Sequence, residues 1–165
     1  MIEYTVFNSP IGKILIAAVK EGVVKISFST ESTSELENYC HRHLGTGVRE
    51  GSEYTRYAKQ QILKYLEGKS QSLDFPVIHL NLPFRKKILE IERNIPYGET
   101  RSYGEVAKMV SNPRASRAVG SANAENPLPL YFPCHRIIAY NGGLGGYGGG
   151  LGVKKYLLDL EARNR

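Results

Sequence analysis

The chain has 165 residues, 41% of them hydrophobic, and a formal net charge of +6 at pH 7. This length suits one ordinary domain or two small ones sharing an interface, and the excess of Lys and Arg favours a polyanionic partner without implying sequence readout. No stretch approaches the roughly 20 apolar residues of a membrane span and the N-terminus lacks a signal-peptide pattern, so we expect a soluble, cytoplasmic protein.

The first 28 residues predict an antiparallel meander of three strands. Apolar residues gather in strand-length runs at 4–7, 14–19 and 23–28, separated by turn residues that include Gly12 and Gly22. Helical patterns follow over 34–43 and 54–66, and Gly68 fits a left-handed stop after the second. We interpret this part as an α+β scaffold.

The two cysteines, Cys40 and Cys134, stand in different settings and are predicted to be free thiols, because a disulfide framework usually carries more pairs. Cys40 begins the run Cys40-His41-Arg42-His43. A zinc site would need ligands from a second segment, and no Cys-x-x-Cys pair is present. We therefore interpret this cluster as a solvated helix end and predict no metal site.

A domain boundary is expected around residues 71–82. This stretch contains Pro76, is followed by Pro83 and has little helical period. It would separate an N-terminal domain over 1–78 from a mostly helical C-terminal domain over 79–165. A helix should begin near Phe84, because apolar residues at 84, 88, 91 and 95 form one stripe. Pro96 should end that helix.

Two short helices are predicted next, with the tight turn of a helix-turn-helix between them. Ser102 and Glu105 have the spacing of a capping box, which predicts a helix through Val110. Asn112-Pro113 should stop that helix and cap the next, over about 114–124. Many such helix pairs bind no DNA.

The second of these helices is rich in small residues. Its composition leaves open close packing against a neighbouring helix or insertion into the minor groove of DNA, which is about 6 Å wide and poorly admits long side chains. The small residues and cations are Arg114, Ala115, Ser116, Arg117, Ala118, Gly120, Ser121, Ala122 and Ala124.

The tetrapeptide Pro133-Cys134-His135-Arg136 offers a thiol, a base and a cation together. A thiol with a pKa of about 8.5 is only a few per cent ionised at neutral pH, so a nucleophilic cysteine needs help from a base or a positive charge. Adjacent side chains on an extended chain point to opposite faces. His135 would then act through a water or a third residue, and adjacency alone does not establish catalysis.

The segments that follow carry a glycine-rich loop and a last helix. Residues 142–152 match neither phosphate-binding nor dinucleotide fingerprints, so we predict no cofactor. The loop is either a flexible connector or, as we favour, a surface for a flat ligand with Tyr147 as its wall. In the helix over 153–163, Glu161 lies at the edge of an apolar stripe, where it is either solvated or satisfied by a donor such as a histidine.

Several motifs of the second half occur together: Arg117-Ala118-Val119-Gly120, Asn126-Pro127, Pro133 to Ile138, the Gly-x-Tyr-x-Gly-Gly loop, and Lys154 with Leu157-Leu158 and Glu161. Taken together, these motifs closely resemble the O6-methylguanine-DNA methyltransferases, in order and spacing from Ser102 to Glu161. The first half matches only in its coarse pattern. The resemblance implies an α+β fold, with a small ribonuclease-H-like N-terminal domain and a helical C-terminal domain that contains the helix-turn-helix.

By this resemblance Cys134 accepts the alkyl group from O6 of a damaged guanine that has been extruded from the duplex. His135 would be the base, acting through a bound water, and Glu161 would orient it. Tyr103 would crowd the 3′ phosphate and help to protonate the departing base, and Asn126 would be the hinge before the active-site segment. Arg136 is not needed by this relay, and we expect it to form a structural salt bridge.

The resemblance also assigns the DNA and base contacts. Arg117 would fill the vacated base stack, on a recognition helix that presents Ala115, Ser116, Ala118, Ser121 and Ala122, together with Tyr103, to the minor groove. The pocket for the extrahelical base would be lined by Tyr147, Gly145, Gly148, Leu144 and Ile137.

The implied reaction leaves a thioether on the protein, which is consumed in one turnover. The expected partner is double-stranded DNA containing O6-alkylguanine, bound by a monomer with no metal or other cofactor. Two alternatives stay open: a cysteine hydrolase that turns over, and a DNA-binding module in which Cys134 is a structural thiol.

Overall fold

The N-terminal residues form the predicted antiparallel meander in the computed structural model, which describes residues 1–28, 32–80 and 83–165. Strands β1 (Ile2–Ser9), β2 (Gly12–Val19) and β3 (Gly22–Phe28) pair in turn, and β4 (Val48–Glu50) adds to β1 in parallel, so the order is β3-β2-β1-β4. Strand β4 was not predicted, because a three-residue strand with one apolar side chain has too little alternation to be detected.

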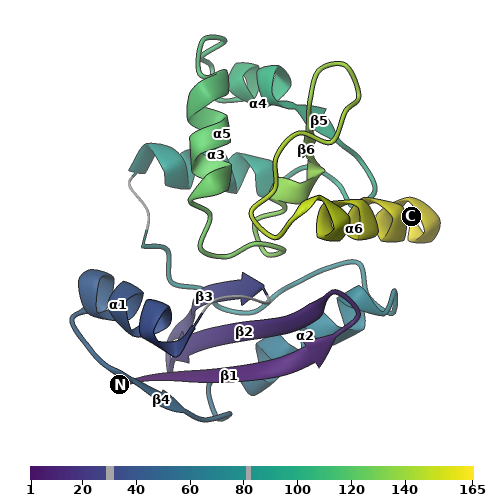
Figure 1. The fold of residues 1–165 in the computed structure, drawn as a ribbon. Helices are drawn as coiled ribbons and strands as arrows, with labels where there is room; N and C mark the ends of the chain where they lie inside the picture. The colour runs from purple at the N-terminus through teal and green to yellow at the C-terminus, as the bar shows by residue number, and fades with distance from the viewer. Residues whose placement is uncertain (29–31, 81–82) are drawn as a thin grey trace. The chain divides into compact units, whose positions relative to one another are not determined.

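Two helices, α1 (Thr33–Leu44) and α2 (Arg56–Leu66), cover this sheet (Figure 1). Leu36 of α1 packs in a cluster with Leu15 of β2. Lys59 of α2 lies over the ring of Phe7 on β1, and Phe7 is paired with Ile14. Because successive side chains of a strand point to opposite faces, Leu15 and Ile14 mark two faces, one under each helix.

The cysteine at the end of α1 is not solvated, contrary to our prediction. Cys40 is 0% exposed and packs in the core between α1 and the sheet, whereas His41 and His43 lie in solvent. Both cysteines are free thiols, as predicted. Among the described residues no cluster of His, Cys, Asp and Glu could hold a metal ion. No helix in the same ranges is long and apolar enough to span a membrane.

The stretch predicted as a boundary continues the sheet before the chain leaves the first unit. Ile78 donates its backbone N–H to the carbonyl of Val23 at 2.8 Å, and Val77 forms a bridge beside the same residue. Gly22 permits this approach, since a Cβ there would lie 2.9 Å from the Pro76 backbone. The chain divides into two compact units, Met1–Leu80 and Asn81–Arg165.

The second unit is mostly helical, as predicted. Helices α4 (Tyr103–Met109) and α5 (Ser116–Ala124) form the helix-turn-helix pair and pack against α3 (Pro83–Arg93). Strands β5 (Arg101–Ser102) and β6 (Ile137–Ile138) pair in parallel, and α6 (Leu151–Asn164) ends the chain. Figure 1 shows these elements in teal, green and yellow.

Of the two helices of the helix-turn-helix pair, one starts where predicted and the other does not. Ser102 accepts the backbone N–H of Glu105 at 3.1 Å and caps α4 as expected. Helix α5 begins two residues later than predicted, with Ala115 at its N-cap position. Asn112 instead closes a local turn, because its Oδ1 accepts the N–H of Arg114 at 3.2 Å.

The core of the second unit lies between α3, α4, α5 and β6. Ile88 and Ile95, two members of the predicted apolar stripe, are buried there. Phe84 at the start of that stripe is 43% exposed and does not join the core. The apolar stripe therefore predicted the buried face of α3 correctly only after the first turn of the helix.

Candidate functional site

The reactive thiol of Cys134 is placed by a short turn at the start of β6. Cys134 opens a 3₁₀ turn, η1 (Cys134–Arg136), and its side chain is only 5% exposed. Strand β6 pairs with β5 so that Ile137 lies opposite Arg101. This pairing brings Tyr103, the first residue of α4, to the region of the thiol.

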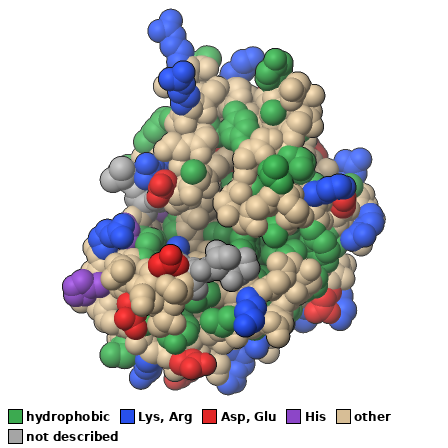
Figure 2. All heavy atoms as spheres, viewed as in Figure 1, with side chains coloured by type: hydrophobic (Ala, Val, Ile, Leu, Met, Phe, Trp, Pro, Cys, Tyr) green, Lys and Arg blue, Asp and Glu red, His purple; other side chains and the backbone are tan. Residues whose placement is uncertain are grey.

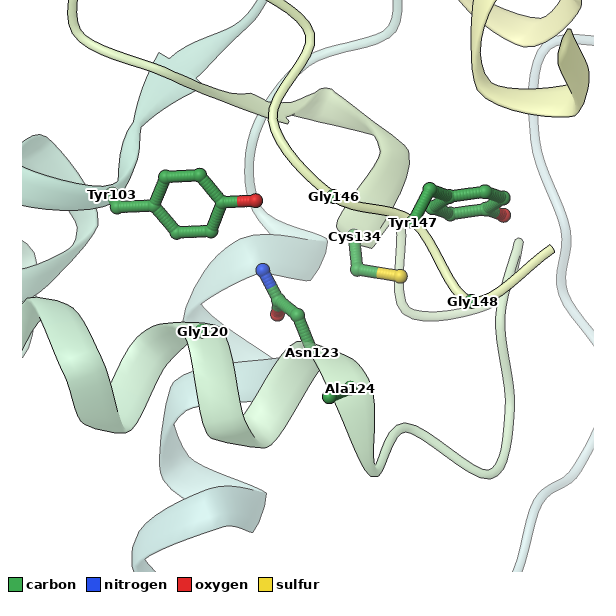
Figure 3. Close-up of a pocket in the computed structure, with 8 residues that line it drawn as sticks. All are labelled: Tyr103, Gly120, Asn123, Ala124, Cys134, Gly146, Tyr147 and Gly148. Carbon is green, nitrogen blue, oxygen red and sulfur yellow. The ribbon is translucent and has the colours of Figure 1, made fainter. Parts of the chain in front are cut away.

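A pocket of about 280 Å³ lies over Cys134. Figure 3 shows Tyr103 and Asn123 directed into it from α4 and α5, and Tyr147 on the other side of the thiol, from the glycine-rich loop. Four predicted site residues, Tyr103, Cys134, Tyr147 and Gly148, are thus brought together. The full lining is Tyr103, Gly120, Asn123, Ala124, Cys134, Gly146, Tyr147 and Gly148.

Three residues predicted for the base pocket do not line it. Ile137 is 0% exposed and packs in the helical core instead. Leu144 and Gly145 lie in the loop but outside the lining. Gly145 has a φ of +69°, and a Cβ there would lie 2.9 Å from the hydroxyl oxygen of Tyr103. A glycine at this position therefore makes room for the Tyr103 hydroxyl.

Asn126 ties together the segment that precedes the thiol. Its Oδ1 accepts the N–H of Leu128 at 2.9 Å, and its Nδ2 donates to the carbonyl of Phe132 at 3.0 Å. The same Nδ2 lies 3.3 Å from Cys134 Sγ and donates to it. A donor to sulfur favours the thiolate over the thiol, so Asn126 both shapes the loop and assists ionisation.

Behind the thiol, His135 and Arg136 converge on one carboxylate from α6. His135 Nε2 lies 2.6 Å from Glu161 Oε2, and both side chains are almost fully buried. Arg136 donates from Nε to Oε1 at 2.8 Å and from an Nη to Oε2 at 3.0 Å. The backbone N–H of Gly98 donates to Oε1 at 3.1 Å. Arg136 thus forms the salt bridge that we expected.

The protonation states follow from burial and these contacts. Burial raises the pKa of the Cys134 thiol to about 12, so the resting sulfur is protonated although Asn126 opposes the shift. Burial lowers the pKa of His135 despite its bond to Glu161, which leaves a neutral imidazole able to accept a proton. Burial alone would raise the pKa of Glu161, but His135 and Arg136 hold it well below the usual range.

Two buried ionisable side chains lie beside this site, and neither had been given a role from the sequence. Lys154 on α6 is 0% exposed and donates from Nζ to the carbonyls of Ile137 at 2.5 Å and Gly146 at 3.2 Å, which ties the glycine-rich loop to β6. Glu92 on α3 is also 0% exposed. Lys and Glu are almost never fully buried, so periodicity gave no signal for Glu92, and Lys154 stood out only as part of a motif.

The residues predicted to face DNA divide between surface and core. Arg117 and Ser121 on α5 are exposed, and Ser116 and Ala118 are partly buried. Ala115 and Ala122, also predicted to face DNA, are 5% and 0% exposed and belong to the helical core. These two alanines pack closely against neighbouring helices, which is the alternative that the composition of the helix left open.

The surface of the chain carries the excess positive charge expected from its composition. Figure 2 shows Lys and Arg side chains projecting into solvent at several places on the face drawn, with hydrophobic and neutral side chains between them. Such a surface attracts a polyanion at long range, and the effect weakens as salt increases.

The helical unit therefore holds a buried thiol with an amide donor and, next to it, a histidine bound to a carboxylate. That arrangement is typical of proteins that use cysteine as a nucleophile. Family models match both units: the 6-O-methylguanine DNA methyltransferase ribonuclease-like domain over residues 2–78, and the DNA-binding domain of the same family over residues 83–163.

Whole-chain comparisons agree with these matches. The chain is 41% identical over 158 residues to a methylated-DNA–protein-cysteine methyltransferase of Methanosarcina acetivorans, covering 96% of this chain and 97% of that protein. A constitutive protein of that name from Bacillus subtilis is 35% identical, over 96% of this chain and 94% of the relative. The crystal structure of Mycobacterium tuberculosis OGT in complex with DNA superposes with a TM-score of 0.86 at 32% identity. The match covers 98% of this chain and 94% of that chain. The chain belongs to the 6-O-methylguanine DNA methyltransferase family.

Proposed function

We propose that this protein repairs DNA by transferring the alkyl group of an O6-alkylguanine irreversibly to its own Cys134. The observation that carries the proposal is the buried Cys134, which faces a pocket, accepts a hydrogen bond from Asn126 and adjoins the His135–Glu161 pair. A flat base needs a pocket with few bulky side chains, and three of the eight lining residues are glycines. No cofactor enters the reaction.

The proton path follows from the geometry of His135. A neutral imidazole that donates from Nε2 to Glu161 keeps its lone pair on Nδ1, which then accepts the thiol proton through a bound water. Cys134 Sγ forms a bond to the alkyl carbon while the bond from that carbon to O6 breaks, and the electron pair leaves with the guanine. Tyr103, whose pKa is raised by burial, stays protonated and helps to deliver a proton to the base.

For DNA binding, we propose that α5 enters the minor groove and that Arg117 takes the place of the extruded base. Arg117 is exposed, and the small Ser116 and Ala118 beside it allow close approach of the backbone. Flipping is required because the thiol is buried, and because O6 of a paired guanine lies at the major-groove edge of the base, on the side opposite the minor groove. We further propose domain limits of 1–78 and 79–165, a monomer as the acting species, and a cytoplasmic location.

The proposed transfer is tested by incubating the chain with a duplex that contains one O6-methylguanine. We expect each chain to gain one methyl group, located on Cys134, and then to be inactive, because a thioether has no easy leaving group. Intact-mass and peptide mass spectrometry measure both. An unmodified chain that releases many methyl groups would instead support a cysteine hydrolase, and binding without any adduct would support a module without chemistry.

Replacing Arg117 with alanine should slow repair of the duplex by about tenfold or more while leaving transfer from free O6-methylguanine base unchanged. The physical reason is that the guanidinium acts on the stack vacated by the flipped base, which the free base does not have. Single-turnover rates on the two substrates measure the difference. Arg114→Ala removes an exposed cation just before α5 and serves as the control for lost charge. Equal loss on both substrates would refute this role of Arg117.

A further inference from the structure

Lys154 is a buried charged side chain to which the proposed transfer gives no role. It lies on the inner face of α6 and is 0% exposed, whereas the next residue, Lys155, is in solvent. A buried ammonium group is costly unless hydrogen bonds compensate for the water that it loses. An apolar side chain would fill the same place without that cost, so the contacts of the ammonium group must supply something that a hydrocarbon cannot.

The ammonium group connects two segments of the chain. Lys154 Nζ donates to the carbonyl of Ile137 at 2.5 Å and to the carbonyl of Gly146 at 3.2 Å. Ile137 is the first residue of β6 and directly follows the turn η1, which begins with Cys134. Gly146 belongs to the glycine-rich loop and lines the pocket together with Cys134. One side chain therefore fixes the wall of the pocket to the strand that follows the thiol.

The wall that Lys154 holds has little stiffness of its own. Seven of the nine residues from 142 to 150 are glycine, and glycine loses more conformational freedom on ordering than any other residue. Figure 3 shows the segment from Gly146 to Gly148 on the other side of Cys134 from α5. The position of this segment sets how closely the loop approaches a base in the pocket.

We propose that Lys154 is a positioning residue that keeps this wall in the form that grips the extrahelical base, and so determines the affinity of the pocket for O6-alkylguanine. This inference rests on the proposed function, because it needs a base in the pocket. No proton or alkyl group passes through Lys154. Its charge strengthens the bond to each carbonyl, since hydrogen bonds from charged donors are stronger than neutral ones.

The expected effect is on binding of the base and not on the chemical step. A base binds only to chains whose wall is in place, so its apparent dissociation constant rises as the fraction of such chains falls. Loss of a hydrogen bond from a charged donor shifts an equilibrium of this kind about tenfold to a hundredfold. A bound base itself holds the wall closed, so the rate of transfer at saturation changes little.

Methylation of Cys134 by free O6-methylguanine base tests this inference, because the free base has no DNA contacts that could compensate for a loose pocket. Lys154→Met keeps a long apolar stem and removes the donor. We expect it to raise the half-saturating concentration of the base about tenfold or more and to change the rate at saturation less than about threefold. Lys155→Met removes an exposed ammonium group from the same helix, paired with Asp159, and should match the wild type in both quantities.

Hydrogen exchange followed by mass spectrometry measures the wall directly. Backbone amides over 144–149 should exchange about fivefold faster or more in Lys154→Met than in the wild type, while those of α5 stay unchanged. Lys154→Arg keeps a charged donor and tests the same connection if Lys154→Met does not fold. Its loop exchange and its half-saturating concentration should both stay within about threefold of the wild type.

The outcomes separate this inference from the proposed function. In any folded variant at position 154, a change in loop exchange without a change in half-saturating concentration, or the reverse, would overturn the inference and leave the proposed transfer intact. A fall in the saturating rate alone would also overturn it, because the charge would then act on the thiol. A wild-type chain that gains no methyl group on Cys134 from an O6-methylguanine duplex would overturn both. Thermal unfolding shows which variants are folded.

Discussion

Replacing Cys134 with alanine should abolish alkyl transfer completely while leaving the affinity for damaged duplex DNA within about threefold of the wild type. The sulfur is the only atom that the proposed reaction bonds to the alkyl group, whereas the DNA contacts that we propose come from exposed residues of α5. The small, almost buried side chain contributes little to docking. Peptide mass spectrometry measures the transfer, and fluorescence anisotropy with a labelled duplex measures the binding.

The second thiol of the chain provides a matched control. Cys40 is buried in the N-terminal unit, so Cys40→Ala should keep full transfer at a modest cost in stability. A methyl group found on Cys40, or on any residue of the Cys134→Ala chain, would show that the acceptor has been assigned wrongly. Loss of DNA binding by Cys134→Ala with its fold intact would make the thiol part of the binding surface.

Replacing Glu161 with glutamine should destabilise the fold by about 3 kcal/mol or more at pH 7, because it leaves the charge of Arg136 buried without its carboxylate. In glutamine an NH₂ group replaces one carboxylate oxygen. This NH₂ group is a donor and cannot accept the hydrogen bonds that Glu161 receives from His135, Arg136 and Gly98. Transfer should slow by about 100-fold, since His135 loses the group that fixes its tautomer and stabilises its imidazolium form. Urea unfolding and single-turnover kinetics measure these effects.

The difference in unfolding free energy between wild type and Glu161→Gln should become smaller as the pH falls. The pKa of Glu161 is lower in the folded than in the unfolded chain, so its stabilising effect is full above pH of about 4.3 and is lost as the pH falls further. The gap between wild type and Glu161→Gln therefore narrows on acidification. Asp159→Asn removes an exposed carboxylate from the same helix, paired with Lys155, and should cost less than about 0.5 kcal/mol. A gap that is small at pH 7, or that widens in acid, would contradict this account.

Much of the fold was predictable because the hydrophobic pattern repeats locally. Strands β1 to β3 and helix α6 carry their period within one segment, and turn residues such as Gly12 mark their ends. Strand β4 is too short for a period. The start of α5 depends on whether Asn112 caps a helix or closes a turn, and one local sequence permits both.

By itself the sequence determined the reacting groups. The order of Asn126, Cys134, His135 and Glu161 identified the family, whereas the position of Glu161 beside an apolar stripe left open whether it is solvated or satisfied by a donor. The order of motifs and the position of a residue relative to an apolar stripe can both be read from the residue types along the chain.

Only the tertiary structure decided which side chains share the pocket and in which state. Glu92, Asn123 and Lys154 come from three different helices and meet near Cys134 because those helices pack together, which no local pattern encodes. Burial then makes the thiol a weak acid, keeps His135 neutral and leaves Glu92 protonated. Removal from water sets each of these charges, and the extent of that removal exists only in the folded chain.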